Sequence, residues 1–156
     1  MFEIKNTIEA IHALMVADND VLTAFGAGNI HKWYPPTPEY MKIIPKPFLN
    51  IMPAGADCLV INGVNPRGSA SAQIPETDKI QIEMGYSFEL NPTATLDIVD
   101  IAKKVVSVIV KNTNKIGSGN AILKLPITGD ITVDPANNTR NIMLNLEYTL
   151  TTNITS

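Results

Sequence analysis

Regular alternation of apolar and polar residues in two segments constrains the fold of this chain more than any other feature. Apolar side chains occupy every even position of residues 80–90, and they do so again in residues 141–150. Successive side chains of a β-strand point to opposite faces of its sheet, so each segment predicts a strand with one face in a core. An apolar sheet face requires a second layer, and helices are the candidates for it.

Apolar residues at three- and four-residue steps predict an amphipathic helix near the N-terminus, with Asn6 and Glu9 as a variant capping box. The residues of this stripe are Ile8, Ile11, Leu14 and Met15. Residues 18–20 then supply a new cap for a short second helix, and Gly26 or Gly28 is suited to ending it.

A longer helix is predicted over residues 95–116, with Thr93 or Thr95 as its cap and Gly117 as its stop. Its β-branched run, residues 105–110, leaves a strand open as an alternative. The periodic apolar stripe, the acidic start and the basic end favour the helix. The stripe consists of Ile98, Ile101, Ala102, Val105 and Ile109.

The connecting segments are less regular. Five prolines in residues 33–47 predict an extended surface connection, and residues 62–78, rich in Gly, Ser, Asn and Pro, predict a long exposed loop. Shorter strands are expected at 48–52, 58–61, 121–127 and 131–133, turns at 128–130 and 135–138, and a frayed tail at 151–156. The sequence therefore predicts one α+β domain over residues 1–156, with an antiparallel or mixed sheet and two main helices packed on one face.

Composition excludes several classes of protein. The 156 residues carry a net charge of −3, with 12 scattered basic residues and a single cysteine, Cys58. We therefore expect no disulfide scaffold, no dedicated nucleic-acid binding and a reducing cytoplasm as the default compartment. We also expect no membrane span and no signal peptide, because the apolar runs are short and the N-terminus is not basic.

Chemistry-bearing residues form no recognisable catalytic pattern. His12, expected on the flank of the first helix, and His31, expected in a surface turn, are too few and too far apart to indicate a metal site. Ser69 and Ser71 lie outside any nucleophile elbow. Gly117–Gly119 follows a helix instead of preceding one, so it does not match a phosphate-binding loop. The carboxylates, including Glu83 on the outward face of a strand, have structural explanations. We predict no catalytic residue, no cofactor and no metal.

Two groups of residues remain as candidates for an interface with other proteins. Trp33, Tyr34 and Tyr40 form the densest aromatic cluster, and prolines stiffen it. Closing one end of the core is the alternative role for these rings. Arg67, Ser69 and Ser71 lie in the predicted exposed loop, where a solvated arginine is the alternative to a contacting one.

In the N-terminal part of the sequence, an amphipathic helix reaches ADNDVL at residues 17–22 and is followed by Phe25-Gly26, Asn29-Ile30, a Pro-rich stretch and the strand PFLNI at residues 47–51. This pattern resembles the tail-terminator and related neck or tail-completion proteins of long-tailed bacteriophages. The later order of loop, strand 80–90, helix and terminal strands is similar to the same α+β fold. Element order over nearly the whole chain carries this resemblance.

The resemblance implies a non-enzymatic virion protein of the tail or neck, assembled in the cytoplasm of a bacterial host. Its copies would form a homo-oligomer, a six-membered ring that caps the tail tube protein and presents a surface to the head-tail connector or neck protein. A head-closure or tail tube protein is the first alternative, and a small-ligand-binding or enzymatic α+β domain is the second.

Overall fold

The computed structural model describes residues 3–33, 47–62, 71–87, 94–116, 121–134 and 139–155. Within these ranges the chain forms three α-helices and a seven-stranded sheet. The helical elements are α1 (Ile4–Ala17), α2 (Asn19–Phe25), α4 (Ala94–Lys111) and the 3₁₀ turns η1 (Ala27–Asn29) and η2 (Thr113–Lys115). The strands are β1 (Ile30–Lys32), β2 (Phe48–Pro53), β3 (Leu59–Ile61), β4 (Ser71–Ser87), β5 (Ile122–Leu123), β6 (Thr128–Asp134) and β7 (Thr139–Thr155).

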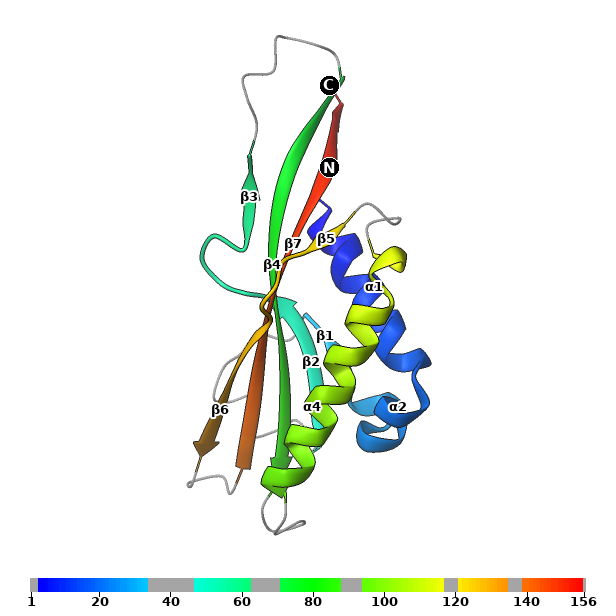
Figure 1. Ribbon diagram of the computed structural model, residues 1–156, viewed down its shortest axis with the longest axis vertical. Coiled ribbons are helices and arrows are strands. Elements are labelled where there is room, and N and C mark those ends of the chain that lie inside the picture. The colour runs from blue at the N-terminus through cyan, green and yellow to red at the C-terminus, as the bar shows by residue number, and fades with distance from the viewer. Residues whose placement is uncertain are drawn as a thin grey trace.

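The sheet is mixed and is built on its two longest strands. Its order is β1-β2-β4-β7-β5, with β3 added beside β4 and β6 added beside β7. β1 runs parallel to β2, whereas the other pairs are antiparallel. β4 and β7 pair over all 17 residues of each strand, from Ser71↔Thr155 to Ser87↔Thr139, and form the long axis of the molecule (Figure 1). The predicted α+β class is confirmed.

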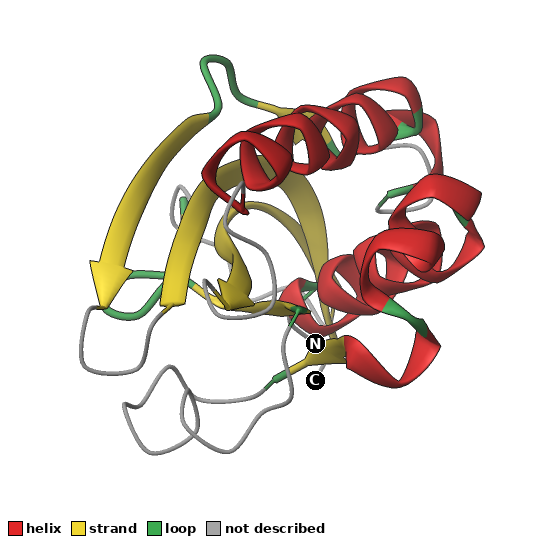
Figure 2. Cartoon of the chain, turned by 90° about the horizontal axis from the view of Figure 1, so that it is seen from below, coloured by secondary structure: helices red, strands yellow, loops and turns green. Residues whose placement is uncertain are grey.

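The helices lie together on one side of the sheet (Figure 2). The predicted strand faces are confirmed, because Ile80, Ile82 and Met84 of β4 are fully buried in the core between the two layers. β7 contributes its even-numbered residues, Ile142, Leu144, Leu146, Tyr148 and Leu150. The helices contribute Ile8, Ile11, Met15, Val21, Phe25, Ala102, Val105, Val108 and Ile109.

The predicted capping box at the start of α1 is wrong. The helix begins at Ile4, and the amide of Thr7 already donates to the carbonyl oxygen of Glu3 at 2.9 Å. Asn6 lies within the first turn, where its Nδ2 donates to Oε2 of Glu3 at 3.0 Å. A local pattern misplaced this boundary because the first turn is held by hydrogen bonds to Glu76 and Asp78, which lie more than 70 residues away in the sequence.

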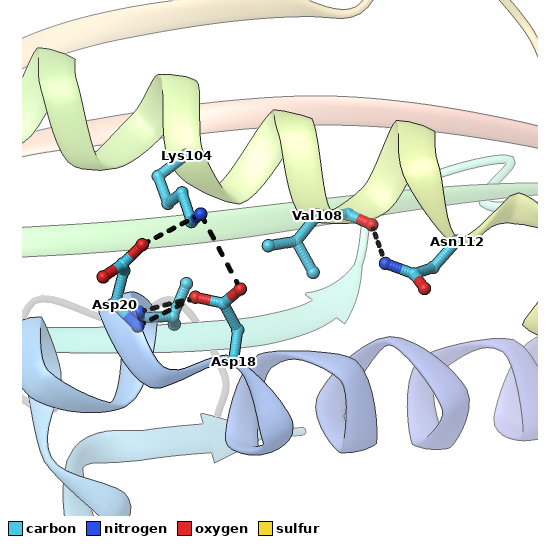
Figure 3. A network of polar contacts seen from close by, with 6 residues as sticks. Asp18, Asp20, Lys104, Val108 and Asn112 are labelled. Atoms are coloured by element: carbon cyan, nitrogen blue, oxygen red, sulfur yellow. Dashed lines mark hydrogen bonds and ion pairs between the residues drawn. The ribbon is translucent and has the colours of Figure 1, made fainter.

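The junction between α1 and α2 follows the prediction closely. The carboxylate of Asp18 accepts hydrogen bonds from the amides of Asp20 and Val21, both at 3.0 Å, and so caps α2. Nζ of Lys104 on α4 lies 2.9 Å from Asp20 and 3.9 Å from Asp18 (Figure 3). α2 ends at Gly26, whose φ of 81° suits glycine.

α4 is a helix through its β-branched run, as the stripe predicted. It ends at Lys111, five residues earlier than predicted. Nδ2 of Asn112 donates to the carbonyl oxygen of Val108 at 2.7 Å, which satisfies a terminal acceptor of the helix, and η2 follows (Figure 3). Thr95 lies inside the helix instead of capping it, and Thr93 and Gly117 fall outside the described residues.

Two predicted irregular segments are ordered by pairing with each other. The predicted loop 62–78 ends early, because β4 begins at Ser71, and the predicted frayed tail 151–156 belongs to β7 as far as Thr155. Residues 71–75 pair with residues 151–155. Pro75 has no amide hydrogen, yet it is tolerated within β4. Its carbonyl oxygen accepts from the amide of Asn62 at 2.7 Å, so its nitrogen also faces away from β7, toward the side where β3 has ended, and the pairing with β7 loses no hydrogen bond.

The C-terminal third also differs in its short strands. The predicted turn 128–130 lies within β6, and the predicted strand 121–127 is reduced to β5, Ile122–Leu123. The amide of Lys124 also donates to the carbonyl oxygen of Glu147 on β7 at 2.8 Å. An added Cβ at Gly129 would approach Cδ2 of Leu144 to 3.0 Å, so the glycine leaves room for the Leu144 side chain between the paired strands β6 and β7. The predicted turn at 135–138 lies outside the described residues.

Candidate assembly surface

β1 forms one lateral edge of the sheet. Trp33 follows β1 directly, with a φ of 69° and 40% of its surface exposed. Its amide donates to the carbonyl oxygen of Ile51 at 2.8 Å, which extends the pairing with β2. Lys32 forms an ion pair with Glu9 of α1, and this pair, together with a hydrogen bond from the Trp33 side chain, lowers the pKa of Glu9. Trp33 is therefore an exposed ring on a firmly held backbone.

Of the predicted interface residues, the structure describes Trp33 and Ser71 and does not bring these two together. Tyr34, Tyr40, Arg67 and Ser69 lie outside the described residues. Ser71 begins β4 instead of lying in a loop, and Trp33 is at the β1 edge. The predicted contact roles of these residues stay predictions.

The opposite edge of the sheet carries an exposed apolar groove. Val110 at the end of α4 is 46% exposed, and Ile122 and Leu125 at β5 are 70% and 67% exposed. These three side chains line an open groove of about 360 Å³ together with Thr113, Ala121 and Leu123. Large exposed apolar side chains gathered in one place mark interaction sites on protein surfaces. The sequence offered no periodic signal for this groove, because a helix end and a two-residue strand build it.

The sheet face away from the helices is polar in part. A groove of about 450 Å³ on this face is lined by residues that include Lys79, Lys124 and Glu147. Nζ of Lys124 lies 3.6 Å from the Glu147 carboxylate, and Gln81 donates to Asn145 at 3.0 Å.

Glu83 lies on this second face, as predicted, but it is buried. Only 4% of its surface is exposed, and its Oε1 accepts from Nδ2 of Asn141 at 3.2 Å. Phe48, Asn50 and Met52 of β2 are buried here as well and lie outside the core beneath the helices. The sheet face away from the helices is therefore less exposed to solvent than the alternation of polar residues along its strands indicates.

The histidines lie near the β1 edge. Nε2 of His12 is 3.1 Å from the carbonyl oxygen of Ile30 on the flank of α1, as predicted. His31 lies in β1, so its predicted place in a surface turn is wrong. Burial lowers the pKa of His31, and the charge of His12 lowers it further. Within the described ranges no group of three or more His, Cys, Asp or Glu side chains could hold a metal ion.

A pair of buried carboxyl groups, Glu76 and Asp78, was not predicted from the sequence. Glu76 and Asp78 fall in the predicted loop, yet both are fully buried beneath the first turn of α1. Burial raises the pKa of Asp78 to about 8, and the hydrogen bond and charge of Glu76 add to this effect. Extending the even-numbered alternation of β4 backwards from Ile80 to Ile74 would have placed both on the core face.

Comparison with known proteins found a similar fold in a solved structure but no match of sequence. No protein-family profile matches the sequence, and no curated protein matches it significantly. A chain from the virion of a native gene transfer agent particle has a similar fold, with a TM-score of 0.53 and 10% sequence identity. The similarity covers 97% of this chain and 100% of that chain. Among the described residues, no helix is long and apolar enough to span a membrane.

Proposed function

We propose that this protein is a structural, non-enzymatic component of a phage-like virion and acts there as a tail terminator. In this role a ring of copies closes the end of the tail tube and joins it to the head connector or neck. The observation that carries the proposal is the end-to-end similarity of the fold to a chain of a gene transfer agent virion. The element order that resembles tail-terminator proteins supports the more specific role.

The placement of exposed apolar residues supports ring assembly. A cyclic ring of identical subunits needs two different surfaces on each copy, one contacting the next copy and one contacting the previous copy. β1 and β5 lie at opposite edges of the sheet, with Trp33 exposed beside one and Ile122 and Leu125 exposed at the other. We assign the subunit contacts to these two edges.

Native mass spectrometry across a concentration series, with negative-stain images of the same samples, tests the proposal. We expect closed rings, six-membered as the resemblance implies, that do not elongate. Open-ended tubes would assign the protein to the tail tube instead. A chain that stays monomeric both alone and with purified tail tubes, and binds no tube end, would overturn the structural role and favour the small-ligand alternative.

A matched pair of variants tests the assigned contact. Ile122→Asp places a charge in the apolar groove and is expected to abolish rings while leaving the monomer folded, because Ile122 is 70% exposed. Asn114→Asp adds the same charge at an exposed position of η2 outside the groove and is expected to leave rings intact. Rings of unchanged stability in Ile122→Asp would show that this edge is not the contact.

A further inference from the structure

Glu76 and Asp78 lie at the point where the β4–β7 pair begins to extend beyond the helices. Beyond this point residues 71–75 and 151–155, which we name the extension, project past α1 (Figure 1). Both side chains are fully buried and share the core face of β4. The carboxyl pair therefore joins the first turn of α1 to the root of the extension.

Hydrogen bonds connect the pair to α1. The amide of Glu3 donates to Oε2 of Glu76 at 3.1 Å, and Oγ1 of Thr7 lies 3.4 Å from Oδ2 of Asp78. The same Oγ1 lies 3.1 Å from the carbonyl oxygen of Glu3. A hydroxyl has one hydrogen to donate, so Thr7 serves two acceptors with a single donor. The carboxyl groups are therefore short of donors.

No positive charge in the described part of the chain compensates the pair. The four ion pairs found there involve other carboxylates, and Oδ1 of Asp78 has no hydrogen-bond partner among the described residues. Charged or unpaired carboxylates are costly to bury, and two of them repel each other. A proton on the pair removes one charge and supplies the missing donor.

Among the described residues, the neighbouring elements add no base or cation. Tyr148 of β7 stands opposite Asp78, and burial raises the pKa of its hydroxyl, which keeps it neutral. β3 places Leu59 and Ile61 opposite Asp78 and Glu76. At the described start of α1, the charge of the Glu3 carboxylate favours protonation of Asp78, and Lys5 is exposed. The lysines of α4 are exposed or paired with the start of α2.

We infer that Glu76 and Asp78 share one proton and act as a proton-dependent latch between the first turn of α1 and the root of the extension. Loss of the proton leaves two adjacent buried carboxylates, which must gain water. β4 is held by β3 and β7 on its two sides, whereas the first turn of α1 is held to the pair by the two contacts described above. The first turn of α1 is therefore the part that opens. This inference does not depend on ring assembly.

Hydrogen exchange at the amide of Thr7, measured by NMR and corrected for the intrinsic exchange rate, tests the latch. We expect its protection to fall by up to about tenfold per pH unit between pH 5.5 and pH 7.5, because in this range the closed form still holds a proton that the open form has lost. Asp78→Asn keeps the shape of the side chain and cannot ionise, so its protection should not change with pH. Asp20→Asn removes an exposed carboxylate and should retain the wild-type pH dependence.

Direct titration of the wild-type chain keeps the test decisive if Asp78→Asn does not fold. The ¹³C carboxyl resonance of Asp78 should titrate with a midpoint near pH 8. A midpoint below pH 5, or protection of Thr7 that falls equally in the wild type and in Asp78→Asn, would overturn the latch.

Discussion

At the scale of single residues, the Phe48–Gly85 pair shows how closely the strands depend on side-chain size. The two residues are register partners on β2 and β4, and Phe48 is almost fully buried. An added Cβ at Gly85 would overlap the Phe48 ring, with Cζ at 2.8 Å and Cδ1 at 2.9 Å. The ring therefore occupies the space that the glycine leaves open.

Gly85→Ala should destabilise the protein by about 1–3 kcal/mol, because the added methyl group overpacks a buried site. Urea denaturation gives the change in unfolding free energy. Gly28→Ala is the matched control, since an added Cβ there meets nothing within 4 Å, and it should leave stability nearly unchanged. Truncating the ring in the double variant Phe48→Leu, Gly85→Ala should recover part of the loss. A neutral Gly85→Ala variant would contradict this packing.

At the scale of elements, the junction of α1, α2 and α4 depends on one carboxylate with two roles. Asp18 caps α2 through two amides and also lies near Lys104 of α4. The cap is a short, direct interaction, whereas the contact with Lys104 spans 3.9 Å between partly exposed side chains. We therefore assign most of the stabilisation to the cap.

Asp18→Ala should lower the unfolding free energy by about 1 kcal/mol, the usual effect of removing an N-cap. Asp18→Asn retains an oxygen that accepts from the amides of Asp20 and Val21, so it should lose much less. Thermal unfolding of the two variants under one condition distinguishes the roles. Equal losses would show that the charge near Lys104 matters more than the cap.

The extension should be the least protected part of the long strand pair. Residues 71–75 and 151–155 pair with each other as regularly as the rest of β4 and β7, but they project past the helices (Figure 1). Local opening of a sheet depends on the apolar packing that covers it. Native-state hydrogen exchange should show the amides of residues 80–84 exchanging at least tenfold more slowly than those of residues 71–74. Equal protection would mean that the extension is covered in solution.

At the scale of the whole molecule, the carboxyl pair couples stability to pH with an unusual sign. The folded pKa of Asp78 is about 8, above its ordinary value of 3.8. Between these two values the folded chain binds more protons than the unfolded chain, so the unfolding free energy falls as the pH rises. The contribution is fully present below about pH 4 and is lost as the pH rises through 8.

The unfolding free energy of the wild type, relative to that of Asp78→Asn, should therefore decrease from pH 5.5 to pH 7.5, by at most about 1.4 kcal/mol per pH unit. Taking the difference between the two chains cancels the titration of the exposed carboxylates. Urea denaturation at several pH values supplies both curves. Parallel curves would show that Asp78 is already ionised in the folded state at pH 5.5.

Much of the architecture could be predicted because it follows from the local periodicity of apolar residues. The even-numbered apolar residues of β4 and β7 and the stripes of α1 and α4 have the spacing of strands and helices, and burial follows that spacing. The Asp18 cap is likewise local, because the side chain bonds to amides two and three residues away. Trp33 could be identified as a candidate contact from its neighbours alone.

Tertiary structure decided the features that depend on residues far apart in the sequence. Residues 71–75 and 151–155 have no strong strand pattern of their own, and each becomes a strand because the other supplies its hydrogen bonds. The same distant pairing places Glu76 and Asp78 in the core, and it brings the end of α4 beside β5 to form the apolar groove. By itself the sequence determined which side chains share a face. Only the fold decided which faces and edges meet, because register and contact depend on partners that local spacing does not specify.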